Sequence, residues 1–457
     1  MSYKTYPEMK DSGVELIGEI PVHWKIASIK RVLEMPVTDG PHETPEILDD
    51  GVPFISAESI KENFIDFSKK RGFISEEDHY RYCLKYKPRR NDIYMIKSGA
   101  TTGNLAIVET DEEFSIWSPL AAIRADIKKV TPRFLLATMN SNEFQTSVKM
   151  FWNYGTQQNI GMNVIENLVI SLAPLLEQTK IANFLDRKTA AIDALITKKQ
   201  RQIELLQEKR QIIINNAVIK GLDPHAPMKN SGVEWIGEIP VEWDVKKTKY
   251  LSRFSNGYSY SSDDWVDVGH PVVRMSNISE LGYLNLNENN TKFISESVAN
   301  KTTGFKLEKN DILIAMTDMS PKMGILGKTV IFYNNDRTHY LNQRVGRIVV
   351  GEKYILVKFM HYFTNCGCFR DQIKSQVYPN VQYNASTESI LNAVITVPPI
   401  IKQDEIVTFL DRKTAEIDIS VSTIQFSIDK LREYRTVLIS NAVTGKIDVR
   451  EESEASA

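Results

Sequence analysis

The segment NFLDRKTAAID occupies residues 183–193, and the segment TFLDRKTAEID occupies residues 408–418. Nine of their eleven positions are identical at a spacing of 225 residues, and the tripeptide NAV recurs at the same spacing, at residues 216–218 and 441–443. An internal repeat constrains the architecture before any element is assigned, because both copies are expected to fold in the same way. The chain therefore consists of two copies of one plan.

Each repeated segment lies in a long stretch that no proline or glycine interrupts, between Pro174 and Lys220 in the first copy and between Pro399 and about Thr444 in the second. Such stretches predict single long helices. Apolar residues recur along both at alternating steps of four and three over five heptads, which is typical of a coiled-coil seam. The seam positions are Leu185, Thr189, Ile192, Ile196, Lys199, Ile203, Leu206, Arg210, Ile213 and Ala217, and Leu410, Thr414, Ile417, Val421, Ile424, Ile428, Leu431, Arg435, Leu438 and Ala442.

In a duplicated frame, the natural partner of each long helix is the other one. We expect an antiparallel coiled coil with a pseudo-twofold relation between the copies. The alternative is that each helix packs only on its own domain. At about 1.5 Å of rise per residue, some 35 helical residues span roughly 50 Å, so such a pair would set a fixed distance between two domains.

A second duplicated segment precedes each variable region: SGVELIGEIPVHW at 12–24 and SGVEWIGEIPVEW at 231–243 agree at eleven of thirteen positions. Between the duplicated segments the copies diverge almost completely. This pattern favours two halves that perform the same kind of function on different targets. The alternative is ordinary sequence drift after the duplication. The predicted divisions are a leader (1–24), a variable region (25–173), a helix (174–220), a linker with the repeated leader (221–243), a second variable region (244–397), and a helix with the C-terminal tail (398–457).

Short β-rich runs lie between Gly, Asn and Asp turns in both variable regions: PFISA (53–57), DIYMI (92–96), PVVRM (271–275) and RVGRIVV (344–350). They predict mixed α/β domains with substantial sheet. The expected fold class is therefore α+β, with two mixed α/β domains separated by the two long helices.

Composition excludes several classes of protein. The longest apolar runs are far shorter than the roughly 20 residues of a membrane span, and the first residues have no signal-peptide core, so we expect a cytoplasmic protein without a membrane partner. Three cysteines exclude a disulfide framework, and Cys366 and Cys368 with His361 lack the further ligands of a zinc site. The net charge of −2 does not by itself favour nucleic acid.

The order of these segments resembles a known family. The second copy has the leader W-I-G-x-I-P-x-x-W, and the helices begin with APLLEQTKIANFLDRKTAAID (173–193) and VPPIIKQDEIVTFLDRKTAEID (397–418). With one variable region between leader and helix in each copy, the chain resembles the specificity subunits of type I restriction-modification systems along essentially its whole length.

This resemblance implies that each variable region is a target recognition domain reading a few base pairs of double-stranded DNA, and that the two read a bipartite target with a fixed spacer. It also implies a non-catalytic subunit without a cofactor or metal of its own. Its partners would be two adenine-N6 methyltransferase (modification) subunits and motor-nuclease (restriction) subunits, which use S-adenosylmethionine, ATP and Mg²⁺. The assembly would defend the cell against foreign DNA.

Segments 37–60 and 89–108 of the first region, and 272–279 and 309–331 of the second, resemble recurrent segments of that family, although Asp318, Met319 and Ser320 stand where a glycine turn is usual. Base edges are read by short polar side chains and by Arg and Lys on surface loops. The DNA-binding candidates are His42, Thr44, Lys97, Ser98, Thr101, Thr102, Asn104, Tyr154, Gln157, Gln158 and Asn159 in the first region, and Tyr258, Tyr260, Asp318, Ser320, Lys322, Gln343, Arg344, Asn380, Gln382 and Tyr383 in the second. At each position the alternative is a turn-forming or solvated loop residue.

The densest basic cluster, Lys85, Lys87, Arg89 and Arg90, has two interpretations: phosphate contact or a solvated face. No motif supports catalysis. The N/D-P-P-Y/F signature of amino-group methyltransferases is absent, and GILGKT (324–329) lacks the first glycine of a phosphate loop, since Lys322 stands there. Two alternatives stay open: a DNA-modifying enzyme with an unrecognised site, and a protein-binding scaffold.

Overall fold

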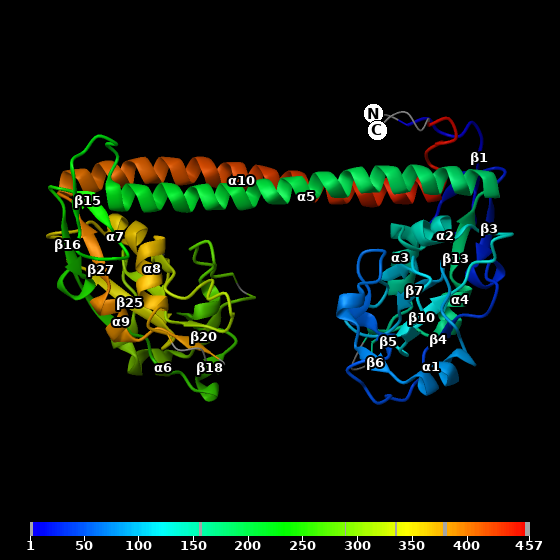
Figure 1. The fold of residues 1–457 in the computed structure, drawn as a ribbon, viewed down its shortest axis with the longest axis horizontal. Helices are drawn as coiled ribbons and strands as arrows, with labels where there is room; N and C mark the ends of the chain where they lie inside the picture. Colours follow the sequence, from blue (N-terminus) through cyan, green and yellow to red (C-terminus); the bar gives the residue numbers. More distant parts are fainter. Residues whose placement is uncertain (1–2, 155–157, 288, 334–335, 378–381, 453–457) are drawn as a thin grey trace. The chain divides into compact units, whose positions relative to one another are not determined.

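The computed structural model describes residues 3–154, 158–287, 289–333, 336–377 and 382–452. The chain forms two compact units: unit 1 comprises residues 1–200 and 425–457, and unit 2 comprises residues 201–424. The two longest helices are α5 (Leu175–Lys220) and α10 (Ile400–Val443), which confirms the two predicted helices (Figure 1). Each of them contributes one part to each unit.

Both long helices begin and end in the same way. The N–H groups of Gln178 and Gln403, in the first turns, donate to the carbonyls of Pro174 and Pro399. Proline suits this position because the first amides of a helix have no partner inside the helix. Beyond the last turns lie Gly221 (φ 78°) and Gly445 (φ 73°). A residue with positive φ ends a helix, and glycine adopts it without a steric cost.

Within each unit the two helices pack side by side and run in opposite directions. In unit 1, Leu185 near the start of α5 shares a core with Leu438 near the end of α10. In unit 2, Ala217 near the end of α5 shares a core with Leu410 near the start of α10. All twenty predicted seam positions are buried or partly buried. The predicted antiparallel pairing is confirmed, and each pair of helix segments also packs on the domain of its own unit.

The domain of unit 1 has a four-stranded antiparallel sheet in the order β4-β10-β7-β8 and a three-stranded sheet in the order β6-β5-β9. In Figure 1, α2 lies between the larger sheet and α5. The elements are β1 (Met9–Asp11), β2 (Glu19–Pro21), β3 (Lys25–Ser28), β4 (Thr38–Asp39), β5 (Val52–Ile55), β6 (Gly72–Ile74), α1 (Glu76–Cys83), β7 (Ile93–Ile96), β8 (Leu105–Ile107), β9 (Ser115–Ile116), β10 (Leu120–Ile123), α2 (Pro132–Met139), α3 (Asn142–Met150), β11 (Asn153–Tyr154), β12 (Gln158–Asn159), α4 (Met162–Asn167) and β13 (Val169–Leu172).

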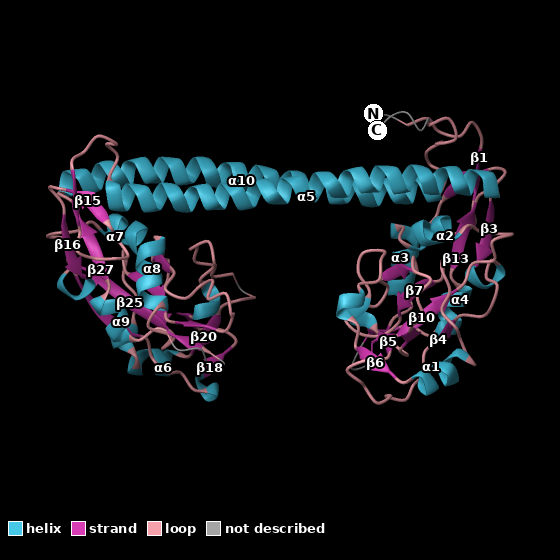
Figure 2. Cartoon of the chain, viewed as in Figure 1, coloured by secondary structure: helices cyan, strands magenta, loops and turns pink. Residues whose placement is uncertain are grey.

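The domain of unit 2 has two four-stranded sheets, in the orders β17-β25-β21-β23 and β18-β20-β19-β24. Both domains mix helices and strands, as expected (Figure 2). The elements are β14 (Met228–Asn230), β15 (Glu238–Pro240), β16 (Asp244–Lys247), β17 (Ser252–Asn256), β18 (Trp265–Val266), β19 (His270–Val273), β20 (Lys292–Ile294), α6 (Glu296–Lys301), β21 (Ile312–Ala315), β22 (Thr317–Asp318), β23 (Thr329–Ile331), β24 (Tyr340–Leu341), β25 (Val345–Val350), α7 (Val357–Thr364), α8 (Gly367–Lys374), β26 (Tyr383–Asn384), α9 (Thr387–Asn392) and β27 (Val394–Val397).

The two domains share a topology although their sequences diverge. In the larger sheet of unit 1, β7 lies between β10 and β8, just as β21 lies between β25 and β23 in unit 2. Asn91 and Asn310 precede β7 and β21, and both have a φ of 72°. Asparagine is one of the few residues other than glycine that tolerate this conformation. The backbone therefore explains why the fragment NDI is retained in both copies.

A buried glutamine ties each long helix to its domain. In unit 1, Gln178 Oε1 accepts from Thr131 N, and its Nε2 donates to the carbonyls of Lys129 and Ala173. In unit 2, Gln403 makes the same three kinds of bond, with Leu356 N and with the carbonyls of Tyr354 and Pro398. Each amide thereby satisfies backbone groups that have no water to bond with.

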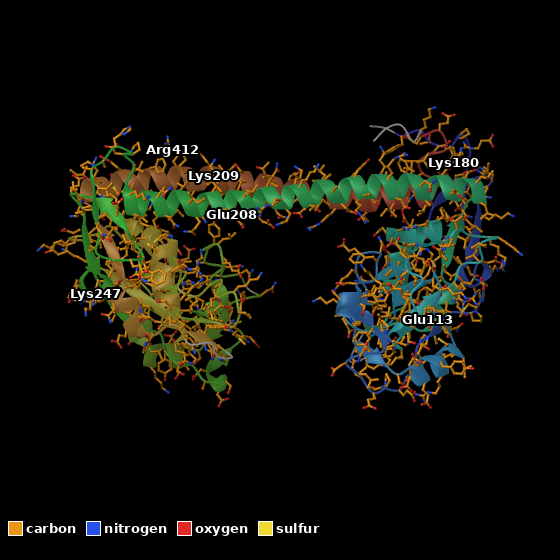
Figure 3. The ribbon with its side chains drawn as sticks, in the orientation of Figure 1. Glu113, Lys180, Glu208, Lys209, Lys247 and Arg412 are labelled. Atoms are coloured by element: carbon orange, nitrogen blue, oxygen red, sulfur yellow. The ribbon has the colours of Figure 1, made fainter. Side chains whose placement is uncertain are left out.

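The surfaces of the long helices carry many charged side chains, among them Lys180, Glu208, Lys209 and Arg412 (Figure 3). None of the helices in the described ranges combines the length and the apolarity that crossing a bilayer requires. In the same ranges, no group of three or more His, Cys, Asp or Glu side chains is arranged to hold a metal ion.

Candidate nucleic-acid interface

In unit 1, three polar segments converge at one edge of the larger sheet. Strands β4 and β7 are both antiparallel to β10, so they run in the same direction and their C-terminal ends lie at the same edge. The third segment, residues 158–159, joins the segment that follows β7. Ser98 and Asn159 form a β-bridge, and Gly99 N donates to the carbonyl of Gln158 at 3.0 Å. We call residues 40–44, 97–104 and 158–159 the first loop cluster.

A buried carboxylate organises this cluster. Lys85 Nζ lies 2.6 Å from Asp39 Oδ1, whereas His42 Nε2 and Lys97 Nζ lie 3.1 and 3.2 Å from Asp39 Oδ2. Burial would raise the pKa of the Asp39 carboxyl, but the hydrogen bonds from Lys85 and Lys97 outweigh it and lower the pKa below its usual value. Asp39 is therefore ionised at neutral pH and holds two predicted site residues, His42 and Lys97, beside each other.

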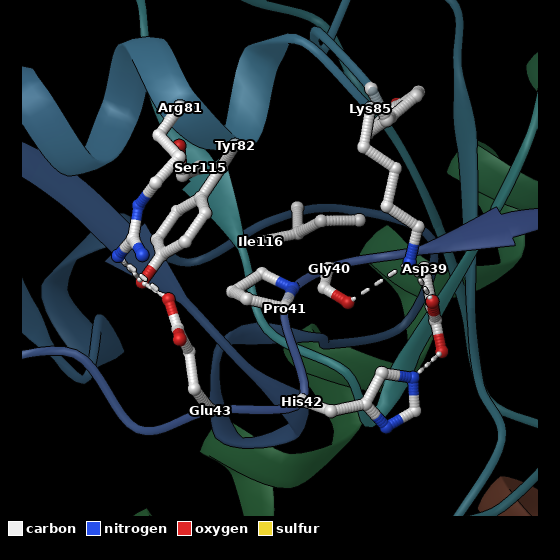
Figure 4. A pocket seen from close by; sticks show the side chains of 11 residues that line it. Asp39, Gly40, Pro41, His42, Glu43, Arg81, Tyr82, Lys85, Ser115 and Ile116 are labelled. Atoms are coloured by element: carbon white, nitrogen blue, oxygen red, sulfur yellow. Dashed lines mark hydrogen bonds and ion pairs between the residues drawn. The ribbon is translucent and has the colours of Figure 1, made fainter.

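A cavity of about 250 Å³ opens next to Asp39. Figure 4 shows Asp39, His42 and Lys85 on one side of it, and Glu43, Arg81 and Tyr82 on the other. Arg81 Nη2 and Tyr82 OH both donate to Glu43 Oε1, at 2.6 and 3.0 Å. The walls thus present both hydrogen-bond donors and acceptors, which is the chemistry that the edge of a base requires.

The sequence hypothesis did not include Arg81 and Tyr82. They lie on α1, about 40 residues from the loop that carries His42, and no local pattern links the two segments. The nearby Arg71 was also missed, and its guanidinium stacks 4.0 Å from the centroid of the Trp117 ring. Only tertiary folding brings these side chains to the candidate interface.

The predicted residues of unit 1 differ in how they are presented. Thr102 is buried, and its hydroxyl donates to the carbonyls of Gly99 and Gln158, so it stabilises the loop from within. Tyr154 belongs to β11, which pairs with β12, and Gln157 lies outside the described residues. Lys97, Ser98 and Gln158 are partly buried, and the exposed candidates are His42, Thr44, Thr101, Asn104 and Asn159.

Unit 2 builds the equivalent surface. Strands β17 and β21 are both antiparallel to β25, so the segments after them leave the same sheet edge, where β25 begins. Strand β22, which follows β21, pairs with β26, and this pairing matches the bridge between Ser98 and Asn159 in unit 1. We call residues 257–260, 318–322, 342–344 and 382–384 the second loop cluster.

Four predicted residues of unit 2 are exposed and three are partly buried. The exposed ones are Tyr258, Lys322, Gln343 and Arg344, and the partly buried ones are Ser320, Gln382 and Tyr383. Asn380 lies outside the described residues. Tyr258 packs edge-on against Tyr260, with ring centroids 5.0 Å apart.

The structure gives Asp318 and Tyr260 internal roles. The buried carboxylate of Asp318 accepts from Ser320 N at 2.7 Å and from Ile325 N at 2.8 Å. This explains how the loop closes without the usual glycine turn, because the side chain supplies the acceptors. Tyr260 is buried against Trp265, and burial raises the pKa of its hydroxyl. Neither side chain is free to face a ligand.

Carboxylates neutralise the basic cluster at residues 85–90. Lys85 pairs with Asp39, Lys87 with Glu113 at 2.5 Å, and Arg90 with Asp111 at 2.8 Å. Arg89 Nη1 lies 3.5 Å from Glu34. These internal partners favour the interpretation of the cluster as a solvated, charge-balanced face over that of a phosphate site.

Comparison of the sequence with known proteins places the chain in a protein family. A family model described as the type I restriction modification DNA specificity domain matches the chain twice, over residues 21–205 and 240–426. The type I restriction enzyme MjaVIII specificity subunit of Methanocaldococcus jannaschii is 23% identical over 410 residues, which cover 89% of this chain and 88% of that protein. The EcoKI specificity subunit of Escherichia coli is 22% identical over 450 residues, which cover 96% and 92% of the two chains.

A solved structure also resembles the chain. It comes from work described as the structural basis of complex assembly and conformational transition of the type I R-M system, and it matches with a TM-score of 0.62 over 94% of this chain and 99% of that one. At 14% sequence identity, this likeness shows a shared fold.

Proposed function

Because this chain belongs to the family defined by the type I restriction modification DNA specificity domain, we propose that it is the DNA-sequence specificity subunit of a type I restriction-modification system. The observation that supports this most directly is that the family model matches both halves, and that each half builds its own loop cluster at the same edge of an equivalent sheet. The role is recognition, and the chemistry on DNA belongs to other subunits.

The two loop clusters lie on equivalent sheets but carry different side chains. The first offers His42, Thr44, Thr101, Asn104 and Asn159 beside a cavity with charged walls, whereas the second offers Tyr258, Lys322, Gln343 and Arg344. Base edges are read by such side chains. Each cluster therefore reads its own short sequence. Because continuous helices rather than flexible linkers join the two domains, we infer a target of two words separated by a gap of constant length.

The partners are inferred from apolar side chains that both copies expose at equivalent positions. Leu176 is 83% exposed and its counterpart Ile401 is 74% exposed, although burial of such side chains is the rule. The other exposed pairs are Leu175 with Ile400, Ile212 with Val437, Leu16 with Trp235, and Val22 with Val241. Apolar side chains exposed at the same positions in both copies offer two equivalent contact surfaces, which suits two copies of one partner. We propose two adenine-N6 methyltransferase subunits as these partners, with motor-nuclease subunits joining the assembly.

The test is the methylome of a host that expresses this chain with its methyltransferase partner. We expect methylated adenines in one bipartite motif with a constant gap. His42→Ala with Asn104→Ala should relax only one word of the motif, and Lys322→Ala with Arg344→Ala only the other. As a control, the exposed Lys309→Gln outside both clusters should leave the motif unchanged. A single uninterrupted methylated word would contradict the proposal.

A further inference from the structure

A second cavity, of about 240 Å³, lies in unit 2 between α5 and the recognition domain. Two cationic side chains, Arg210 and Lys328, line it together with the amides of Gln207, Gln211 and Asn365. One carboxylate, the exposed Glu280, also reaches its wall. Nothing in the function proposed above uses this cavity.

Neither cation has the close carboxylate partner that partly buried cations normally have. Among the described residues, the ammonium of Lys328 makes no hydrogen bond and no ion pair. Arg210 Nε is buried without an acceptor among the same residues, its Nη1 donates to the carbonyl of Leu281 at 3.3 Å, and its Nη2 lies 3.8 Å from Asp418. Burial, with the nearby cations Arg370, Arg210 and Lys374, lowers the pKa of Lys328 to about 8, so the ammonium is still largely protonated at neutral pH.

The other copy of the repeat does not share this arrangement. Arg435, the counterpart of Arg210, is neutralised by Asp193, with Nε 3.0 Å from Oδ1. The strand register aligns Ile331 with Ile107, so Lys328 corresponds to the uncharged Asn104. The excess of positive charge is thus a property of unit 2 and not a requirement of the shared frame.

We propose that this cavity binds a phosphate-class oxyanion, held by the ammonium of Lys328 and the guanidinium of Arg210. A planar guanidinium and a nearby ammonium are the side chains that bind phosphate oxygens in proteins, and the amide of Gln207 adds a neutral donor. The amide of Gln211 already donates to Asn215 and to the carbonyl of Asn365. A volume of about 240 Å³ holds such an ion with several waters, since one water occupies about 30 Å³ of liquid. His361 lines the same cavity, but burial lowers the pKa of its ring to about 4, so it is neutral there.

The oxyanion has two sources, a backbone phosphate of DNA or free phosphate. Glu280, on the wall of the cavity, lies against Gly324, which follows residues 318–322 of the second loop cluster closely in the chain. Binding of a DNA phosphate in this cavity rests on the proposed function, whereas binding of free phosphate does not.

The experiment measures binding of inorganic phosphate to the full-length chain by calorimetry and thermal shift, and binding of duplex DNA over a range of salt concentrations. The variants are Lys328→Gln and Arg210→Gln, with Lys309→Gln as an exposed control. Lys328 is partly buried and has no partner among the described residues, so Lys328→Gln should not impair folding; circular dichroism checks both variants. We expect the parent and the control to bind phosphate, and Lys328→Gln to bind at least tenfold more weakly.

The two arms separate the sources. If Lys328→Gln also weakens duplex binding and reduces the slope of log K against log salt by about 1, the anion is a DNA phosphate. If only inorganic phosphate binding weakens, the cavity is a free-anion site. Phosphate binding that is absent from the parent or equal in parent and Lys328→Gln, together with unchanged duplex binding, overturns the proposal. A chain that binds no duplex in any variant contradicts the proposed function and leaves the phosphate arm to decide on the cavity.

Discussion

Arg435 and Asp193 face each other across the helix pair of unit 1, with Arg435 Nε 3.0 Å from Asp193 Oδ1. The repeat places Arg210 and Asp418 at the equivalent positions of unit 2, yet there the nearest approach is 3.8 Å. The two copies have kept the same residue types at the same seam positions, but only one pair is in close contact. The two units therefore share the sequence pattern of the helix pair but differ in the strength of its ion pair.

This inequality predicts different coupling energies for the two pairs. Exposed and half-exposed ion pairs contribute about 0.2–1 kcal/mol when their geometry is good. We expect a coupling of about 0.5 kcal/mol between Arg435 and Asp193 and close to zero between Arg210 and Asp418, measured by double-mutant cycles in urea unfolding. Equal couplings in the two units would contradict the difference in geometry.

Replacing the buried glutamine of either unit should loosen the junction between helix and domain. Gln403→Leu removes three hydrogen bonds and leaves Leu356 N and the carbonyls of Tyr354 and Pro398 buried without this partner. We expect the free energy of unfolding to fall by about 3 kcal/mol, since each orphaned buried group costs about 1–3 kcal/mol. The exposed Gln202→Leu on α5 is the matched control and should change it by less than about 0.5 kcal/mol.

His361 should make the stability of unit 2 depend on pH. Burial, followed by the cations Arg210 and Lys328, lowers the pKa of its ring to about 4 from the ordinary 6.5. Between these values the unfolded chain binds a proton that the folded chain does not, so the free energy of unfolding falls as the pH falls from 6.5 towards 4. His361→Gln cannot titrate, so its unfolding free energy, measured in urea from pH 7 to pH 5, should fall less steeply than that of the parent. Parallel curves for the two proteins would refute this role.

The equivalent exposed pairs predict where the methyltransferase subunits dock. Leu176→Glu together with Ile401→Glu should weaken the assembly with the methyltransferase at least tenfold, because each substitution would bury a charge in a contact that is now apolar. Ile419→Glu is the matched control: Ile419 is also exposed on α10, but the equivalent residue of α5 is Ala194. Analytical ultracentrifugation of the mixed subunits checks this, and an unchanged stoichiometry in the double variant would remove these residues from the interface.

Much of the frame was predictable from the sequence because its signals are periodic or repeated. The seam residues from Leu185 to Ala217 and from Leu410 to Ala442 are buried or partly buried as the heptad pattern predicts, and the runs PFISA, DIYMI, PVVRM and RVGRIVV each overlap an observed strand. The candidate site was harder to predict. The sequence pattern around polar residues such as Tyr260 and Asp318 is the same whether their side chains face solvent or, as here, are buried.

By itself, the sequence determined the duplication, the two long helices and the apolar seam along each, because each of these follows from identities or spacings within the chain. Only the tertiary structure decided which charged groups meet. Asp39 meets Lys85 and Lys97, whereas one cavity is lined by Arg210, which lies 3.8 Å from Asp418, and by Lys328, which has no ion pair among the described residues. The physical reason is that an ion pair depends on positions within a few ångströms, and those positions are set by strand register and loop closure between segments far apart in the sequence, for which no periodic pattern exists.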